Sequence, residues 1–135
     1  MPYFNKVFLM GHLGRDPELR QTKTDRPVVK FSLATSESWT DKEGNKQKKT
    51  NWHNIVIWDR KAEIANEFLS VGDLILLEGR LDYREYQDKD GQARSITEIT
   101  VFNFQMIKTK KGTKEGKPPN NQQDSNEEEY EGANF

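Results

Sequence analysis

Residues 31–58, FSLATSESWTDKEGNKQKKTNWHNIVIW, contain all three tryptophans of the chain and predict two strands joined by a polar segment. In the second strand, residues 51–58, side chains alternate between two faces. One face already carries isoleucines for a core, so we expect the opposite, tryptophan-bearing face to be a solvent-exposed surface. The core face holds His53, Ile55 and Ile57, and the other face holds Trp52, Asn54, Val56 and Trp58.

The polar segment, residues 40–50, is expected to be a solvated loop with a turn at Gly44-Asn45. Indoles beside lysines suit single-stranded nucleic acid, because a base stacked on an aromatic ring contributes roughly 1–3 kcal/mol and nearby cations can follow the phosphates. The alternative is that each tryptophan belongs to the core, since an indole buries a large apolar area. The lysines of the segment are Lys42, Lys46, Lys48 and Lys49.

Composition indicates one small domain followed by a polar segment without apolar periodicity. The chain has 135 residues, of which 33% are hydrophobic and 32% are charged, enough for one modest core. Acidic and basic residues are nearly balanced over residues 1–108, whereas acids predominate in residues 109–135. The second segment cannot bury enough apolar surface to offset its ordering entropy, so we expect it to be disordered.

The sequence lacks the features of a secreted or membrane-inserted protein. It contains no cysteine, which excludes disulfides, thiolate metal sites and a cysteine nucleophile. The apolar run in MPYFNKVFLMGHLGRD is too short and too interrupted for a signal-peptide core or a membrane span. We therefore expect a cytoplasmic protein.

The remaining segments predict further strands and one helix. Residues 4–14 are apolar on both faces, which favours a strand buried on two sides, and Gly11 predicts a bend or a close backbone approach. Residues 60–69 carry a one-sided apolar stripe and predict a helix, with Asp59 as its N-cap and Gly72 after its end. The other predicted segments are a short strand or loop at residues 19–26 and strands at residues 28–36, 73–86 with a kink at Gly79, and 95–107.

Five main strands with one helix between the third and the fourth predict an all-β, five-stranded OB-fold barrel. In this fold the second and third strands and the connecting loops bind oligonucleotides. The short helix is expected to close one end of the barrel. We therefore divide the chain into an OB-fold domain for binding single-stranded nucleic acid, residues 1–108, and a disordered linker with an acidic tail, residues 109–135.

Residues that support catalysis or metal binding are sparse in the sequence. His12 and His53 lie far apart and lack the spacing of paired metal ligands. Asp88 and Asp90 leave a Mg²⁺-dependent nuclease as a minor alternative, but DKDG at residues 88–91 is typical of a hairpin turn. It also differs from a calcium loop, in which the glycine comes two positions later. We expect no catalytic residue, no metal and no cofactor.

Several segments together resemble the bacterial single-stranded DNA-binding protein family. The matching order and spacing extend over residues 1–107, and the combination is specific to this family among OB folds. The resemblance implies an OB barrel that assembles as a homotetramer and wraps single-stranded DNA in replication, recombination and repair, without enzymatic activity. The segments are NKV at residues 5–7, GHLGRDPE at 11–18, ATSESW at 34–39, TNWH at 50–53 and EGRL at 78–81.

The resemblance also implies roles for particular side chains. His53 matches a position at the family's subunit interface. The acidic tail is expected to bind replication and repair proteins, and the protein itself is expected to be associated with the nucleoid. Base stacking is expected from Trp39, Trp52, Trp58 and Tyr86. Phosphate contacts are expected from Lys42, Lys46, Lys48, Lys49, Arg60 and Arg84. Partner-protein binding is expected from Glu127, Glu128, Glu129 and Phe135.

Two segments depart from the family pattern. Residues 82–85 read Asp-Tyr-Arg-Glu where the family is often basic, and the tail ends Glu-Glu-Glu-Tyr-Glu-Gly-Ala-Asn-Phe in place of aspartates followed by Ile, Pro and Phe. A primosomal or RNA-binding OB protein and a scaffold that acts through its tail are the remaining alternatives. The acidic tail terminated by phenylalanine favours the single-stranded DNA-binding family over the primosomal or RNA-binding protein, whereas the scaffold predicts that truncation at Lys111 removes the activity.

Overall fold

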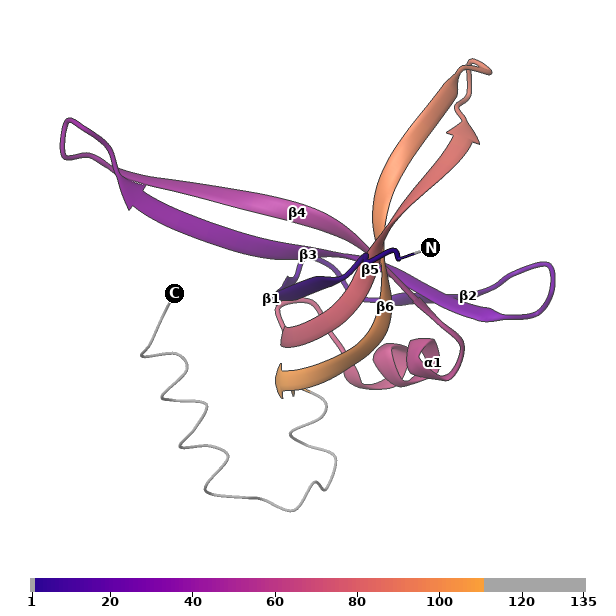
Figure 1. Ribbon diagram of the computed structural model, residues 1–135. Coiled ribbons are helices and arrows are strands. Elements are labelled where there is room, and N and C mark those ends of the chain that lie inside the picture. Colours follow the sequence, from indigo (N-terminus) through magenta and orange to yellow (C-terminus); the bar gives the residue numbers. More distant parts are fainter. Residues whose placement is uncertain (1, 111–135) are drawn as a thin grey trace.

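Six strands and one helix make up residues 2–110, the part of the chain that the computed structural model describes. The sheet has the order β1-β5-β6-β4-β3-β2, and an additional β1–β3 pairing closes it (Figure 1). The expected five-stranded OB barrel is confirmed, with the short β2 lying along β3 as an extra strand. The elements are β1 (Val7–Leu13), β2 (Glu18–Gln21), β3 (Pro27–Thr40), β4 (Lys46–Trp58), α1 (Asp59–Phe68), β5 (Leu74–Gln87) and β6 (Ala93–Lys108).

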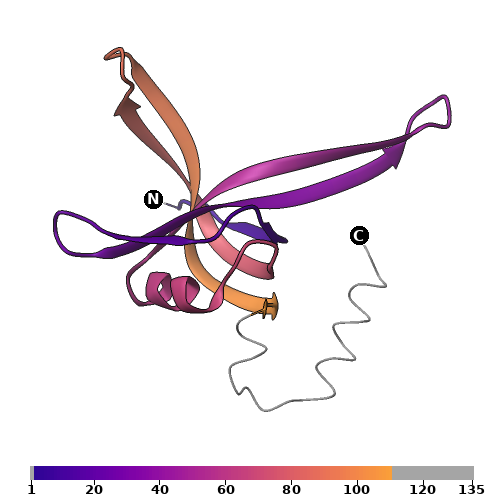
Figure 2. The ribbon, with the colours of Figure 1, turned by 180° about the vertical axis from the view of Figure 1, so that it is seen from behind.

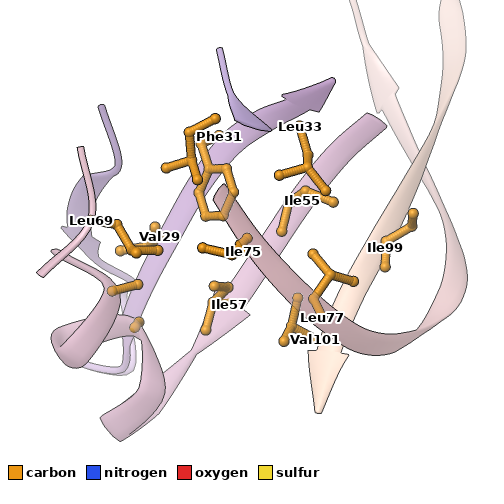
Figure 3. Packing of buried hydrophobic residues seen from close by; sticks show 13 residues of the cluster. Val29, Phe31, Leu33, Ile55, Ile57, Leu69, Ile75, Leu77, Ile99 and Val101 are labelled. Carbon is orange, nitrogen blue, oxygen red and sulfur yellow. The ribbon is translucent and has the colours of Figure 1, made fainter. Parts of the chain in front are cut away.

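The core forms from the alternating apolar residues of β3 and β4 (Figure 3). Phe31 lies opposite Ile55 and Val29 lies opposite Ile57, and none of these four side chains is more than 1% exposed. Burying each aliphatic or aromatic side chain contributes about 1.5–3 kcal/mol. The inward orientation expected for Ile55 and Ile57 is confirmed. β5 and β6 complete the cluster with Ile75, Leu77, Ile99 and Val101.

Helix α1 packs against one end of the barrel, as the sequence indicates (Figures 1 and 2). Its buried residues are Ala62 and Ala65, which join the barrel core together with Leu69 just beyond the helix. Small side chains let the helix approach β3 and β4 closely. None of the helices in residues 2–110 is long and apolar enough to cross a bilayer.

The N-terminus of α1 differs from the expectation. Trp58 occupies the N-cap position and makes no side-chain cap hydrogen bond, so the prediction that Asp59 caps the helix is wrong. Asp59 is the first helical residue, and its carboxylate instead accepts two hydrogen bonds from Arg26. At the other end, Gly72 adopts a φ of 89° before β5 begins.

Two glycines permit close contact between neighbouring strands. A Cβ atom on Gly11 would overlap the carbonyl oxygen of Ala34, and one on Gly79 would overlap that of Thr100. Gly79 also lies at a register shift between β5 and β6, which is the expected kink. The close backbone approach predicted at Gly11 is confirmed.

β1 is buried on one side only within the chain. Leu9 packs against the core, but Phe8 is 66% exposed, so the prediction of a strand buried on both faces is wrong for the single chain. Residues 7–11 pair with β5 on one edge, and the pairing with β3 involves only His12 and Leu13. The outer face and the free edge of β1 are therefore exposed.

Two long hairpins, β3–β4 and β5–β6, extend from the barrel in different directions (Figures 1 and 2). The solvated loop expected at residues 40–50 is wrong, because β3 continues to Thr40 and β4 begins at Lys46. Only a tight turn separates them, in which Asp41 N–H donates to the Asn45 carbonyl at 2.9 Å. We call this β3–β4 projection the lysine arm, residues 36–50.

Candidate nucleic-acid interface

Trp52 lies on the outer face of β4 and is 60% exposed. Its ring lies against Gly14, where a Cβ atom would overlap the indole, and its cross-strand neighbour is the small Ala34. The indole is thus supported along one side and open to solvent elsewhere. The predicted exposure of this strand face is confirmed at Trp52, and the side chain is accessible to a planar base.

The same strand face is less open near its end. Val56 is only 4% exposed, so the prediction of a free surface is wrong at this position. Trp58 is half-buried, and the guanidinium of Arg26 lies 4.5 Å from the centroid of its ring. Arg26 in turn pairs with Asp59, which raises the pKa of the guanidinium and lowers that of the carboxyl through their shared hydrogen bonds.

Trp39 lies on the opposite face of the lysine arm from Trp52. Trp39 pairs with Gln47 and Trp52 pairs with Ala34, and directly paired residues place their side chains on the same face of a ladder. Because residues 34 and 39 differ in parity, the two indoles point to different sides of the hairpin. Trp39 is 48% exposed, so each face of the β3–β4 hairpin presents an aromatic ring.

The lysines of the arm are exposed and are divided between the two faces of the hairpin. Lys46 and Lys48 share the Trp52 face by register, whereas Lys49 shares the Trp39 face. Within residues 2–110, neither these three nor Lys42 forms an ion pair. Four ammonium groups are therefore available to phosphates on one projecting hairpin.

The turn of the lysine arm is held by Asp41. Its Oδ1 accepts hydrogen bonds from the N–H groups of Glu43 and Asn45, at 2.9 and 2.8 Å, and Oδ2 accepts one from Gln47. These bonds, led by the one from the Asn45 backbone, lower the pKa of Asp41. The turn is thereby fixed while the lysines stay free.

Arg84 is already paired inside the molecule. Its Nε and Nη2 donate to the two carboxylate oxygens of Glu98 at 3.2 and 3.0 Å, and Lys30 lies 3.9 Å from the same carboxylate. Glu98 is 6% exposed, and its hydrogen bonds raise the pKa of Arg84. The expected phosphate contact at Arg84 would have to compete with this buried carboxylate.

Tyr86 and Arg60 lie at separate places on the surface. Tyr86 lies near the end of β5 and is 44% exposed, and the centroid of its ring is 5.8 Å from Arg84 Cζ. Arg60 is exposed on α1 and forms a 3.4 Å pair with Glu63. A nucleic-acid strand that contacts both residues would have to cross from the β5–β6 hairpin to helix α1.

His53 is half-buried on the inner face of β4. Its Nε2 forms a 2.9 Å hydrogen bond with Thr35 Oγ1 across the β3–β4 ladder, and burial lowers the pKa of the imidazole. Its assignment to a subunit interface stays a prediction.

Two cations beside the tryptophan face were missing from the sequence prediction. Lys30 pairs with Val56 and shares the outer face with Trp52, and the alternation of Lys30 with Val29 and Phe31 was a signal that could have found it. No local sequence pattern identifies Arg26, because Trp58, whose ring it contacts, is remote in sequence.

Some expected sites carry other roles or lie outside the described residues. Asp88 fixes the β5–β6 turn by accepting from the N–H groups of Asp90 and Gln92, and it pairs with Arg94, which lowers its pKa. Among residues 2–110, no group of three or more His, Cys, Asp or Glu side chains is arranged to hold a metal ion. The tail residues Glu127, Glu128, Glu129 and Phe135 lie outside the described range.

The sequence is similar to those of known proteins over most of its length. A sequence model described as the single-strand binding protein family matches residues 4–107. A single-stranded DNA-binding protein of Neisseria meningitidis serogroup A is 46% identical over 103 residues, which cover 76% of this chain and 59% of the relative. Single-stranded DNA-binding protein 1 of Chlorobaculum tepidum is 46% identical over 107 residues, covering 78% of this chain and 66% of the relative.

A solved structure, nearly all of whose chain is matched, has a similar fold. The structure is described as the Plasmodium falciparum SSB in complex with ssDNA, and it superposes with a TM-score of 0.71 at 30% sequence identity. The match covers 78% of this chain and 96% of that chain.

Proposed function

The chain belongs to the single-strand binding protein family, and on this premise we propose that it binds and protects single-stranded DNA during replication, recombination and repair. Binding is independent of sequence, because aromatic stacking and phosphate contacts do not read base edges. The names of the relatives from Neisseria and Chlorobaculum, and the ssDNA in the Plasmodium complex, support this assignment.

The observation that carries the proposal is the open indole of Trp52 on the same strand face as the unpaired Lys46 and Lys48. Trp52 is 60% exposed and supported by Gly14, so a base can stack on it without rearrangement of the strand. Lys46 and Lys48 extend from the same face and can neutralise the phosphates that follow. Affinity is expected to fall with salt, with a slope of roughly −0.7 per neutralised phosphate.

The full set of contacts extends over both hairpins. Trp39 adds a stacking site on the other face of the lysine arm, and Trp58 and Tyr86 add sites at the end of β4 and on β5. Lys42, Lys49, Arg60 and Arg84 complete the phosphate contacts. In this assignment Arg84 either exchanges the Glu98 carboxylate for a phosphate or attracts the DNA only through its positive charge.

Assembly as a homotetramer is part of the proposal. β1 supports it with an edge that is unpaired over residues 7–11 and with Phe8, which is 66% exposed. Exposed edges and large apolar side chains are typical of surfaces that pair with another chain. Four barrels would join their grooves into one wrapped path and raise avidity. His53 would lie at a subunit contact.

The acidic tail is proposed to recruit replication and repair proteins through Glu127, Glu128, Glu129 and Phe135. The support is compositional, since clustered carboxylates beside a terminal aromatic ring suit a basic, apolar groove. We propose that the protein acts in the cytoplasm on the nucleoid and acts by binding alone, without catalysis or a cofactor.

Substrate preference tests the proposed function. Fluorescence anisotropy of an end-labelled oligo-dT is expected to show saturable binding that unlabelled oligo-dT displaces and that the same length of duplex displaces poorly. Equal displacement by duplex would contradict the proposal. Stronger displacement by oligo-U than by oligo-dT would favour the RNA-binding alternative, and Mg²⁺-dependent cleavage of the label would favour the nuclease.

A further inference from the structure

The ring of Trp58 is covered by a cation from a different part of the chain. Arg26 Cζ lies 4.5 Å from the centroid of the indole, within the range of cation–π contact. Trp58 is the last residue of β4, and Arg26 immediately precedes β3. A base that stacks on this face of Trp58 has to take the place of the guanidinium.

The guanidinium is held on the ring by one exposed carboxylate. Arg26 Nε donates to Asp59 Oδ1 at 3.0 Å, and Nη2 donates to Oδ2 at 2.8 Å. The two side chains are 53% and 57% exposed, and ion pairs so exposed to water add little to stability. The fork can therefore open at small cost when another anion approaches.

Hydrogen bonds with Thr22 hold the backbone of Arg26 in place. Thr22 bonds Arg26 twice, through its own N–H to the Arg26 carbonyl at 3.0 Å and through its hydroxyl from the Arg26 N–H at 3.1 Å. Asp59 adopts a φ of 64°, in the left-handed region that Asp and Asn tolerate better than most residues. Rotation of the Arg26 side chain alone is enough to uncover the ring.

We propose that Arg26 is a nucleic-acid contact: a nucleotide of the bound strand takes its place on Trp58, and the guanidinium exchanges the Asp59 carboxylate for a backbone phosphate. The inference rests on the proposed single-stranded DNA binding. The planar fork of an arginine fits carboxylate and phosphate alike, so the exchange preserves its paired hydrogen bonds. Asp59 opposes binding, because it competes for Arg26 and repels the strand.

This site lies at the opposite end of β4 from the lysine arm. Lys46 begins the strand and Trp58 ends it, with Trp52 between them on the same outward parity. A contact at Arg26 therefore extends the path of the DNA from Trp52 past the covered Val56 to the end of β4. The path then reaches the β2–β3 connection, where Arg26 lies.

Two variants test this exchange, one that removes the positive charge of Arg26 and one that removes the negative charge of Asp59. Loss of one single-strand phosphate contact, at a slope of roughly 0.7, weakens binding about eightfold at about 50 mM salt and hardly at about 1 M. Arg26→Ala is expected to show this loss of affinity for an oligo-dT. Asp59→Asn keeps the left-handed backbone accessible and is expected to tighten binding at low salt.

Lys23→Ala is the matched control. Lys23 is an exposed cation in the same connection and makes no hydrogen bond or ion pair within residues 2–110. Its removal is expected to change affinity less than about twofold, because it has no aromatic ring beside it and only the long-range field changes. Thermal unfolding of each variant verifies that the barrel remains folded at the assay temperature.

The signs of the two effects decide the outcome. Weaker binding by Arg26→Ala with tighter binding by Asp59→Asn supports the exchange. Unchanged or tighter binding by Arg26→Ala would overturn it and make Arg26 a shield over the ring, and weakening by both variants would reduce the pair to a structural role. Salt-dependent binding by the native chain with an unresponsive Arg26→Ala rejects only this inference, whereas failure of the native chain to bind oligo-dT rejects the proposed function as well.

Discussion

Replacing Trp52 by alanine removes the most exposed indole of the interface. A stacked base contributes roughly 1–3 kcal/mol, so we expect affinity for an oligo-dT to fall roughly 5- to 150-fold. The effect on folding is separable. Trp52 is 60% exposed, so roughly 60–100 Å² of ring area is buried, and losing it costs at most about 1.5–2.5 kcal/mol of unfolding free energy.

The assay is a fluorescence-anisotropy titration of labelled oligo-dT at a temperature well below the unfolding midpoint of the variant. Trp52→Phe is the matched variant, because phenylalanine retains a stacking ring beside Gly14, and it should recover most of the affinity. Tyr3→Ala removes an aromatic side chain that is 79% exposed but lies outside the interface, and it should bind like the native chain.

The refuting result for Trp52 is unchanged affinity in Trp52→Ala while its unfolding midpoint falls. Such a variant would show that the indole serves packing against Gly14 and does not stack bases. Equal losses in Trp52→Ala and Tyr3→Ala would instead point to a nonspecific effect of aromatic removal.

Three further predictions follow from the fold and the charges. Gly11→Ala should destabilise the barrel by several kcal/mol, on the order of an overpacked core, because its Cβ meets the backbone of Ala34; a native-like midpoint in thermal unfolding would refute this. Glu98→Gln should lower the unfolding free energy by about 1–3 kcal/mol, because it removes the charge of the buried partner of Arg84. It should nevertheless tighten DNA binding at low salt, because the phosphates no longer compete with a carboxylate for Arg84 and Lys30; weaker binding would count against this. Burial lowers the pKa of His53 below 6.5, so the unfolded chain binds this proton more readily; stability should be full above about pH 6.5 and fall as the pH drops below it, and urea unfolding of His53→Asn should show a weaker dependence.

Local patterns were enough to predict the barrel. Alternation in β3 and β4 identified the inward side chains because strand periodicity depends only on neighbouring residues. Gly11 and Gly79 marked close approaches for the same reason, since only glycine fits where another backbone passes within van der Waals contact. The exposure of Trp52 followed from Ile55 and Ile57 already filling the core side.

Long-range contacts decided where prediction failed. Asp59 satisfies a helix-cap pattern, but its carboxylate accepts hydrogen bonds from Arg26, which lies 33 positions away in the sequence. Glu98, on which no prediction was made, is buried and pairs with Arg84 across the β5–β6 ladder. No local pattern predicts such partners.

The length of the lysine arm was also missed for a physical reason. Residues 40–50 are polar on both faces. They were predicted to form a loop because a strand was expected to have at least one apolar face. Pairing with β3 continues to Lys46 because the backbone ladder extends beyond the core. A strand that leaves the barrel needs no buried face.

The most direct measurement is the intrinsic tryptophan fluorescence of the full chain during titration with oligo-dT at low and high salt. We expect strong, saturable quenching with an affinity that falls linearly with the logarithm of salt concentration, because indoles stack on bases in a lysine-lined path. Binding that leaves the fluorescence unchanged would contradict stacking by Trp39, Trp52 and Trp58, and the absence of any binding would contradict the proposed function.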